Sequence, residues 1–599
     1  MQPLPKIDPD TLPIEAWLPV SRKEMDKRGW EQADIILISG DAYVDHPSFG
    51  IAVIGRTLEA AGYRVAILPQ PNWRDDLRDF RKLGRPRLFF GVSAGSMDSM
   101  VNHYTARKRL RSNDAYTPGG QAGFRPDYPT IVYSRILKEI YPDVPVVVGG
   151  IEASMRRITH YDYWQDRLRP SFLVESGADL LVYGMGEKPI VEIARQLERD
   201  PRAESCRNIL QVSYLEKGAL NPSPVPEADL VLEPHERCLK DKRCQAGNFA
   251  VVETASNMMR CGRILQETAW GTVVVNPPFP FEPGGHEIDK SFDLPYTRLP
   301  HPRYKNRGEI PAFTMIQNSI TLHRGCFGGC SFCTISAHQG KHVHSRSEES
   351  VLKEIQQLAR MPYFKGNLSD LGGPSANMYG MHGKDLAKCA RCKKPSCLFP
   401  SVCPNLNPDH KPLLDLYRKV ASLPGVRHVF IGSGVRYDML VPYLDTGGRG
   451  KPSQNHAREY AQWLIENGVS GRLKVAPEHT EAPVLERMRK MPFAQFEEFK
   501  RFFDGHCRRC RLNFQLIPYF ISAHPGCTQK DMERLQEKTR HLGYKLEQVQ
   551  LFTPTPMTLS TETYYTGLDP YTLKPVFTER DFAKRDRQTE CFFWYKIRK

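Results

Sequence analysis

The strongest constraint on the fold is a regular alternation of short apolar segments and helical periodicity across residues 33–200. The apolar segments fall at 35–39, 65–68, 88–92, 144–148 and 179–183, and the helical segments at 51–61, 136–140 and 190–197. Strands that are apolar along nearly their whole length need cover on both faces, which a parallel sheet between two layers of helices provides. Residues 1–200 are therefore predicted to form a doubly wound α/β domain.

A second alternation of strands and helices begins near residue 313. Its expected strands are 314–323, 368–371, 428–431, 473–476, 513–520 and 548–553, and each runs into a loop rich in glycine, proline or polar residues. In barrel-like α/β folds the reactive groups gather at the carboxyl ends of the strands. We therefore expect a partial (β/α)6 barrel over residues 305–570, with a functional site where these loops meet.

Three further segments differ in composition from these two units. Residues 201–304 lose the periodicity and gather prolines, which predicts a bridging segment. Residues 375–410 form a cysteine-rich insertion in the barrel, and residues 571–599 form a tail with basic residues beside aromatic ones. Such a tail suits contact with RNA, although a docked tail is the commoner outcome.

The most specific chemical signal is a loop with Cys326, Cys330 and Cys333, directly after an expected strand. Thiolates are soft ligands that suit iron–sulfur clusters, and a four-iron cluster normally takes four of them. Three cysteines leave one iron open to chelate the amino and carboxylate groups of S-adenosylmethionine (SAM). Nearby glycines let the backbone wrap closely because they carry no Cβ. The spacing therefore predicts a 4Fe-4S cluster that cleaves SAM reductively.

Three other interpretations of these cysteines compete with this one. They are buried free thiols, a zinc site completed by His323 or His338, and a four-cysteine cluster with its last ligand elsewhere in the chain. Three free cysteines within eight positions of a glycine-rich loop are unusual, and this spacing after a strand is a stronger signal than a lone pair of cysteines. We therefore favour the SAM-binding cluster.

Motifs at residues 40–50, 149–154, 326–333, 476–480 and 518–526 together cover nearly the whole chain. In these motifs the chain resembles the radical SAM proteins of the YgiQ type. The resemblance implies that Cys326, Cys330 and Cys333 ligate the cluster and that Phe332, the aromatic residue before the last cysteine, packs near the adenine of SAM. It implies no substrate.

The second expected strand of the barrel ends in Gly372, Gly373 and Pro374, where radical SAM enzymes commonly carry Gly-Gly-Glu. The resemblance implies that the backbone of this loop meets the methionyl amino group of SAM. Proline lacks the N–H donor but keeps its carbonyl acceptor, so contacts to that carbonyl remain available. Any role of the family's glutamate at this position is in doubt here. Three residues after later strands are candidates for contacts with the SAM ribose or carboxylate, with structural roles as the alternative: Ser433, Arg436 and Glu478.

A second group of cysteines, Cys389, Cys392, Cys397 and Cys403, lies in the insertion among lysines, arginines and prolines. Four thiolates suit either a structural zinc ion or an auxiliary iron–sulfur cluster, and the sequence does not separate the two. Either metal would order a loop that has no core of its own, whereas loose surface thiols are the alternative. We predict a second metal site here.

The N-terminal unit resembles cobalamin-binding domains in its topology and in its strand ends at 146–150 and 179–187. The cobalamin signature has one residue between its aspartate and its histidine, whereas Asp45 and His46 are adjacent. Pro47 also restricts His46 toward extended backbone. We therefore expect no cobalamin bound through a histidine, and base-off cobalamin above these strand ends stays open.

Composition sets the expected compartment and partners. The 83 basic and 68 acidic residues give a formal charge of +15, which favours RNA or another polyanion, although a generally basic surface is equally compatible. The longest apolar stretches fall far short of the roughly 18 residues that span a bilayer, so no membrane contact is expected. Residues 1–19 lack a secretory pattern, and clustered cysteines suit a reducing, cytoplasmic setting.

These observations predict a radical SAM enzyme that acts on an unknown substrate, with RNA as a candidate. Its electrons must come from a low-potential donor of the flavodoxin or ferredoxin type, because the chain shows no flavin or nicotinamide fingerprint of its own. The contrasting hypothesis is a non-catalytic iron–sulfur protein that binds RNA or senses redox state.

Overall fold

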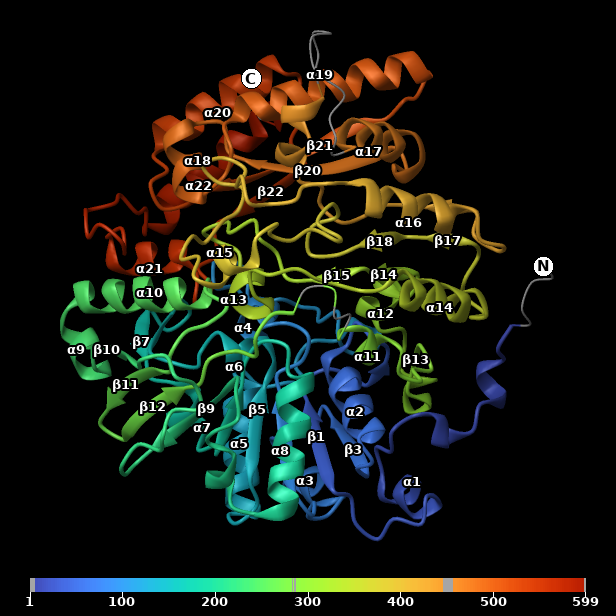
Figure 1. The fold of residues 1–599 in the computed structure, drawn as a ribbon, viewed down its shortest axis with the longest axis vertical. Coiled ribbons are helices and arrows are strands. Elements are labelled where there is room, and N and C mark those ends of the chain that lie inside the picture. Colours follow the sequence, from blue (N-terminus) through green and yellow to red (C-terminus); the bar gives the residue numbers. More distant parts are fainter. Residues whose placement is uncertain (1–5, 283, 285–286, 445–455, 597–599) are drawn as a thin grey trace.

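The computed structural model describes residues 6–282, 284, 287–444 and 456–596 and shows two α/β units packed on each other. The N-terminal unit forms the lower half of Figure 1 and the C-terminal unit the upper half. Among the helices within these ranges, none is long and apolar enough to cross a membrane.

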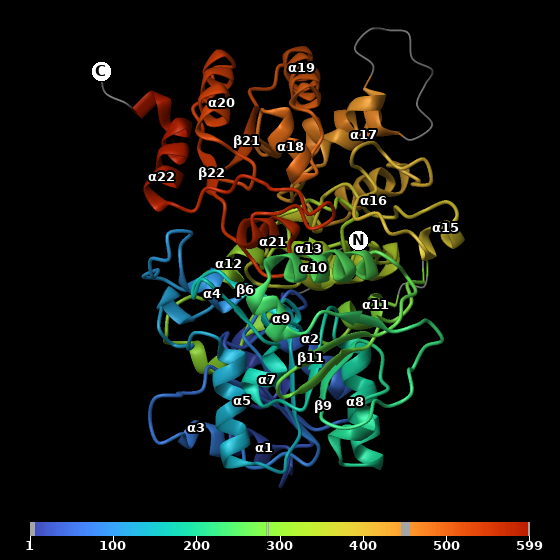
Figure 2. The same ribbon diagram turned by 90° about the vertical axis from the view of Figure 1, so that its left-hand side faces the viewer.

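The N-terminal unit is built on a nine-stranded sheet with the order β10-β11-β12-β9-β8-β5-β4-β1-β3. Five of its strands are mutually parallel: β1 (Ile35–Ser39), β3 (Val65–Pro69), β4 (Phe89–Ser93), β5 (Val146–Gly149) and β8 (Leu180–Val182). One face packs on α2 (Gly50–Ala60) and α8 (Glu187–Arg199), and the other on α5 (Pro129–Ile140) and α7 (Phe172–Ser176). Figure 2 shows α5 and α8 on opposite sides. The predicted doubly wound sheet is confirmed.

Part of the segment predicted as a bridge continues this sheet. β9 (Val212–Glu216), β12 (Gly271–Val275) and β11 (Ile264–Thr268) follow β8 in antiparallel pairings, and β10 (Leu230–Leu232) pairs with β11 in parallel. The bridging prediction for 201–304 is therefore wrong over residues 212–275. These strands approach the edge of the sheet, where side chains such as Val231 are exposed, so they lack the continuous apolar pattern of the central strands.

The C-terminal unit carries the parallel strands that the sequence predicts. They are β14 (Ser319–Thr321), β17 (Asn367–Leu368), β18 (Asp370–Gly372), β19 (His428–Val429), β20 (Arg472–Glu478), β21 (Gln515–Ser522) and β22 (Gln548–Leu551). Their pairings, β14 with β18, β17 with β19 and β20-β21-β22, are all parallel. The first strand begins later than predicted, because Pro311–Ile316 forms helix α12 with proline at its start. The α/β class is confirmed.

Helices form the outer layer of the barrel. They include α14 (Glu348–Ala359), α16 (Lys411–Ala421), α19 (Phe493–Cys510) and α20 (Gln529–His541). Their buried residues join the apolar core that also lies under α2 and α8 of the N-terminal unit. One continuous core therefore runs through both units.

The basic, aromatic tail is docked onto the fold. It forms α22 (Phe582–Glu590) and a 3-10 turn at Cys591–Lys596, and residues 597–599 lie outside the described ranges. Arg585 is buried and donates hydrogen bonds to the Tyr163 hydroxyl at 2.8 Å and to the Phe552 carbonyl oxygen at 2.5 Å. Several residues that suggested RNA contact are thus engaged within the protein.

A buried ion pair ties the N-terminal unit to the segment that leads into the barrel. Arg56 of α2 donates from Nη2 to Asp45 Oδ2 at 2.6 Å and from Nε to Asp45 Oδ1 at 3.0 Å. Asp45 also accepts a hydrogen bond from the Thr297 N–H at 2.9 Å. Its strand β2 (Val44–Asp45) pairs with β13 (Leu299–Pro300). One carboxylate therefore joins three parts of the chain.

Replacement of Arg56 by Met should lower the free energy of unfolding by about 3–5 kcal/mol, because the Asp45 carboxylate would stay buried without its partner. Chemical denaturation followed by circular dichroism measures the change. The matched control is Arg22→Met, whose exposed ion pair with Asp26 should contribute about 0.5 kcal/mol or less. Equal losses in the two variants would contradict the role assigned to the buried pair.

Candidate functional site

The three-cysteine loop joins β15 (His323–Arg324) to α13 (Ile335–Gln339). The loop closes onto the residues after α13, because the Cys326 N–H donates to the Gly340 carbonyl oxygen at 3.1 Å. Gly325 has a φ of +85°, and a Cβ there would lie 2.0 Å from the His342 carbonyl oxygen. Only glycine fits this close approach. The three cysteines are free thiols and half-buried.

The backbone of the loop brings these cysteines near one another, since the Cys333 N–H donates to the Cys330 carbonyl oxygen at 3.2 Å. Burial raises the pKa of Cys326, against the effect of the Arg436 guanidinium. Burial together with the charges of the other two cysteines raises the pKa of Cys333 to about 12. Arg436 Nη1 lies 3.5 Å from Cys330 Sγ, and the Gly328 N–H lies 3.4 Å from Cys326 Sγ. A cation and an amide donor thus face sulfurs that become negative when they ligate a metal.

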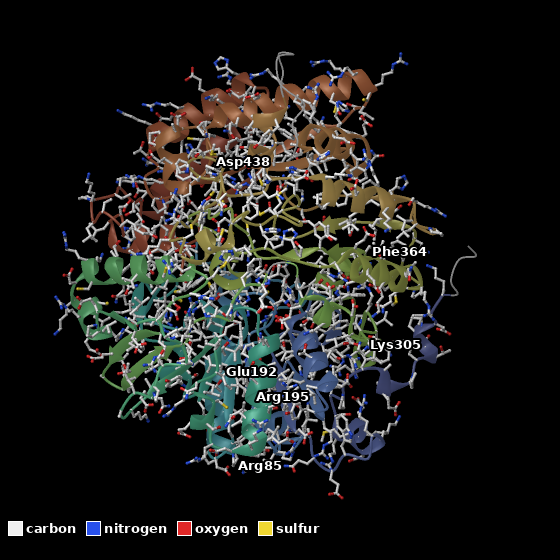
Figure 3. All side chains as sticks on the ribbon, in the orientation of Figure 1. Arg85, Glu192, Arg195, Lys305, Phe364 and Asp438 are labelled. Carbon is white, nitrogen blue, oxygen red and sulfur yellow. The ribbon has the colours of Figure 1, made fainter. Side chains whose placement is uncertain are left out.

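Arg436 is fixed beside the cysteines by its backbone and its side chain. Its N–H donates to Asn377 Oδ1 at 2.8 Å, and its carbonyl oxygen accepts from Asn377 Nδ2 at 3.1 Å. Its Nε donates to Asp438 Oδ1 at 2.9 Å, and Figure 3 marks Asp438 inside the upper unit. Burial opposes the charge, but Asp438 and Cys330 raise the pKa of Arg436 well above its ordinary value. The guanidinium therefore stays charged.

The Gly-Gly-Pro loop at the end of β18 is packed too tightly for side chains. A Cβ on Gly372 would lie 2.6 Å from Ser433 Oγ, and one on Gly373 would lie 2.5 Å from His323 Cε1. Ser433 is held by Asp370, which accepts from Ser433 Oγ at 2.5 Å and from its N–H at 3.1 Å. These residues form a cradle with open backbone at the strand ends.

His323 forms one wall of this cradle. It is fully buried, and neither ring nitrogen has a hydrogen-bond partner in the described part of the chain. Burial lowers its pKa to about 3, so the ring is neutral near neutral pH. A buried neutral imidazole with two free nitrogens is poised to contact a bound ligand.

Glu478 and Phe332 complete the set of sequence-predicted residues. Glu478 ends β20 in the left-handed region, with a φ of +69°. Its Oε2 is buried without a hydrogen-bond partner among the described residues. Burial raises the pKa of this carboxyl group, and the Lys490 Nζ atom lies 3.9 Å from Oε1. Strained backbone of this kind gathers at functional sites. Phe332 is half-buried and packs edge-on against His524, with ring centroids 6.1 Å apart.

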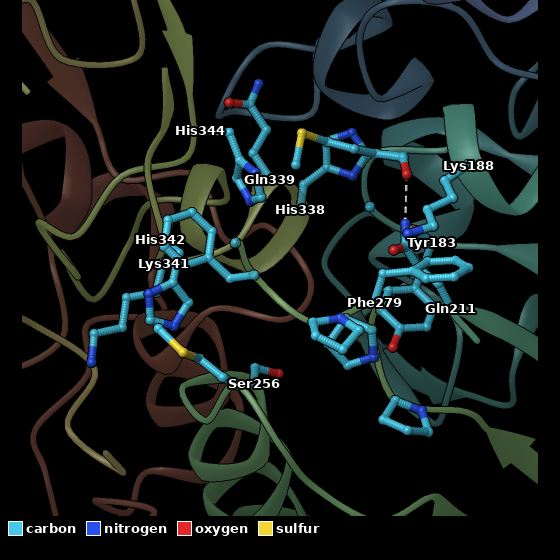
Figure 4. A pocket seen from close by; sticks show the side chains of 18 of the residues that line it. Tyr183, Lys188, Gln211, Ser256, Phe279, His338, Gln339, Lys341, His342 and His344 are labelled. Atoms are coloured by element: carbon cyan, nitrogen blue, oxygen red, sulfur yellow. Dashed lines mark hydrogen bonds between the residues drawn. The ribbon is translucent and has the colours of Figure 1, made fainter. Parts of the chain in front are cut away.

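The carboxyl ends of the two sheets face each other across a cavity of about 580 Å³. Its lining combines strand ends of the N-terminal unit with the cradle: Ser93, Gly149, Gly150, Gly184, His323, Gly372, Gly373, Pro374 and Ser433. A second cavity of about 210 Å³ adjoins it and shares His338 and the Arg324–Glu187 ion pair (Figure 4). Ligands of open α/β sheets bind beyond the carboxyl ends of the strands, so the geometry favours binding here.

His46, the histidine of the incomplete cobalamin signature, is buried between Phe49 and Phe313. Its Nδ1 accepts a hydrogen bond from the Ser48 N–H at 3.1 Å. Burial lowers its pKa well below the ordinary value. The chain neighbours Pro47 and Ser48 line the large cavity.

The second group of cysteines is held together by its backbone, since the Cys392 N–H donates to the Cys389 carbonyl oxygen at 3.1 Å and the Cys403 N–H donates to the Cys397 carbonyl oxygen at 2.8 Å. Burial raises the pKa of Cys397 to about 11; Lys341 opposes the shift, and the charges of Cys389, Cys392 and Cys403 add to it. Lys341 Nζ lies 3.5 Å from Cys392 Sγ, and Asn405 Nδ2 lies 3.2 Å from Cys389 Sγ. Four thiols with donors aimed at their sulfurs suit a metal with thiolate ligands.

Sequence reasoning missed the residues that hold the predicted ones in place. Asp370 anchors Ser433, Asn377 and Asp438 hold Arg436, and Lys341 contacts the second group of cysteines. Two of these residues lie next to the ones they hold: Asp370 directly precedes the Gly-Gly-Pro loop, and Asp438 follows Arg436 by two positions. Asn377 and Lys341 come from segments that are distant in the sequence from the residues they contact.

Comparisons with known proteins identify relatives of this chain. A family model described as Radical SAM N-terminal matches residues 17–319. A UPF0313 protein of Porphyromonas gingivalis is 61% identical over 585 residues, which cover 98% of this chain and 91% of the relative. A UPF0313 protein of Bacteroides thetaiotaomicron is 58% identical over 591 residues, which cover 97% of this chain and 94% of the relative.

Among solved structures, the radical S-adenosylmethionine methyltransferase TsrM from Kitasatospora setae, with cobalamin and a [4Fe-4S] cluster bound, aligns with a TM-score of 0.47. It is 16% identical, and the alignment covers 88% of this chain and 77% of that one. The family matches, by contrast, span nearly the whole chain at high identity and confirm the resemblance to YgiQ-type radical SAM proteins. The chain belongs to the UPF0313 family and carries its Radical SAM N-terminal domain.

Proposed function

We propose that this chain is a radical SAM enzyme in which Cys326, Cys330 and Cys333 hold a 4Fe-4S cluster. The observation that carries the proposal is a single loop with three cysteines beside Arg436, whose Nη1 lies 3.5 Å from Cys330 Sγ, together with the glycine cradle at the end of β18. When bound, such a cluster supplies one electron for the reductive cleavage of SAM at its sulfonium.

The surrounding residues suit the parts of SAM. Gly373 carries no side chain and Pro374 keeps its backbone carbonyl acceptor, which fits the methionyl group, and the Ser433 hydroxyl packs against Gly372 of the same loop. Glu478 has a buried oxygen with no partner in the described ranges, which fits a ribose hydroxyl donor. Phe332 offers a half-buried ring for the adenine.

The contrasting function is a non-catalytic iron–sulfur protein that senses redox state or binds RNA. Such a protein has no need of a glycine cradle that opens on a large cavity, so the Gly-Gly-Pro loop favours the enzyme. We further propose a low-potential donor of the flavodoxin or ferredoxin type as the source of electrons. RNA stays a candidate substrate because of the net charge of +15. The tail no longer adds support for RNA, since it is docked onto the fold.

Substitution of Cys326, Cys330 and Cys333 by Ala should abolish reductive cleavage of SAM, because no other side chain takes over three ligands of one cluster. The measurement is 5′-deoxyadenosine formed from SAM by the anaerobically reconstituted protein with dithionite, quantified by chromatography. Cys244→Ala, outside both groups of cysteines, is the control and should keep the activity. A triple variant that still forms 5′-deoxyadenosine would exclude the enzyme assignment.

A second proposal concerns the large cavity, which we infer to receive cobalamin in its base-off form. The lining continues from the strand ends down to Leu37, Gly91 and Val147 in mid-sheet, opposite Ile51 and Ile54 of α2. This apolar slot between sheet and helix suits the flat heterocycle of a nucleotide tail, and close-packed interiors seldom keep such voids. The corrin itself would lie at the strand ends, where bound cobalamin supplies a cobalt centre for group transfer.

The chain's own residues favour a form without a histidine ligand. His46 packs against Phe49 and Phe313, and its Nδ1 is engaged by the Ser48 N–H. The lining near the mouth instead offers hydroxyls and glycine backbone, such as Ser93 and Gly149, which suit the neutral amides of a corrinoid.

The protein incubated with hydroxocobalamin and desalted should retain it stoichiometrically, as shown by its visible spectrum. His46→Ala should retain it equally, whereas Ile54→Trp should lose it because the indole fills the slot. Circular dichroism checks that both variants are folded. Failure of the unaltered protein to retain cobalamin would exclude the cofactor, and loss in His46→Ala would show histidine ligation instead.

A further inference from the structure

The cysteine-rich insertion packs directly on the three-cysteine loop. The Cys397 N–H donates to the Phe327 carbonyl oxygen at 2.9 Å, and Phe327 directly follows Cys326. A Cβ on Gly329 would lie 2.3 Å from the Pro395 carbonyl oxygen, so the contact needs glycine there. Both groups of cysteines also pack against one small apolar cluster that includes Phe327. The two sites are therefore neighbours joined by backbone contacts.

A second connection runs through Lys341. Its ammonium lies 3.5 Å from Cys392 Sγ, and the side chain is almost fully buried. The preceding residue, Gly340, accepts the hydrogen bond from the Cys326 N–H at 3.1 Å. A short path of covalent and hydrogen bonds thus links a ligand of each group. Such a path can carry one electron between two buried centres.

The outer surface of the insertion is strongly basic. Exposed cations surround its cysteines: Lys384, Lys388, Arg391, Lys393 and Lys394, which we name the basic collar. The one acidic residue among them, Asp385, caps helix α15 (Leu386–Ala390) through hydrogen bonds to the backbone. Helix α15 lies at the outer edge of the molecule in Figure 2. The collar is therefore a positive surface open to a partner.

We propose that the insertion is the electron-input port of the enzyme: its four cysteines hold an auxiliary iron–sulfur cluster, and the basic collar docks an acidic, low-potential donor protein. The proposal rests on the proposed function. The donor gives one electron to the auxiliary cluster, which passes one electron to the cluster on Cys326, Cys330 and Cys333. That electron enters the carbon–sulfur bond of SAM that breaks. Zinc has no redox chemistry and fills no such role.

Charge complementarity selects the partner. A negative donor face meets the positive collar, which speeds encounter at low salt and orients the donor's redox group toward the cysteines. Lys341 acts as a positioning residue, because its buried charge offsets the thiolates of the second group and its backbone joins the two sites.

Metal content tests the first half of the proposal. Three proteins are reconstituted anaerobically. They are the full chain, a variant with Cys389, Cys392, Cys397 and Cys403 changed to Ser, and a variant with Cys326, Cys330 and Cys333 changed to Ala. Iron, acid-labile sulfide and zinc are then measured. Each variant should keep the iron and sulfide of one cluster, and Cys244→Ser, the control, should keep both. Zinc at the second group, or no metal there, overturns the proposal.

Electron transfer tests the second half without removing a ligand. The variant with Lys388, Arg391 and Lys393 changed to Glu should keep both clusters, and its reduction by reduced flavodoxin should slow by at least about tenfold at low salt. Its reduction by dithionite, a small reductant, should not change. The control reverses Lys23 and Lys27, which are exposed on α1 (Arg22–Lys27), drawn at the bottom of the molecule in Figure 1, well below α15.

The two proposals fail in different ways. Unchanged reduction of the collar variant by flavodoxin overturns the electron-input port, whatever the fate of SAM. Absence of 5′-deoxyadenosine from the unaltered protein with dithionite instead overturns the radical SAM activity, because dithionite bypasses the collar.

Discussion

Three glycines in the cysteine loop let three separate segments of the chain pack closely against it. Gly325 meets the carbonyl of His342, Gly328 meets the guanidinium of Arg436, and Gly329 meets the carbonyl of Pro395. A methyl group at any of these glycines would overlap its neighbour and push one segment away. Everything else proposed for the site, from the charge beside the sulfurs to the contact with the insertion, depends on this close packing.

Much of the fold follows from local sequence patterns. β1, β4 and β5 are buried along most of their length, so their apolar runs predict parallel strands directly. β9–β12 escaped prediction because their sequences mix polar with apolar residues: β9 carries Ser213 and Glu216 although it is largely buried, and β10 at the sheet edge exposes Val231. The start of the barrel was misplaced because Pro311 begins a helix in a segment that is otherwise apolar enough for a strand.

The site was predictable only where its residues are contiguous. Cys326, Cys330 and Cys333 share one loop, so their spacing carries the chemistry by itself. Arg436 is a predicted contact of SAM, but its partner Asn377 and its approach to Cys330 depend on loops that meet only in the folded chain. The contact between the insertion and the cysteine loop is likewise invisible in sequence, because it is made by backbone groups.

The continuous core of the two units limits how ligands can enter and leave the large cavity. Because the apolar residues under α2 and α8 merge with those of the barrel, the units cannot swing apart without exposing that core. The large cavity is then preformed, and little conformational entropy is lost when it fills. Ligands must therefore enter and leave the cavity through brief local motions of the residues around its opening rather than through a hinged opening of the two units.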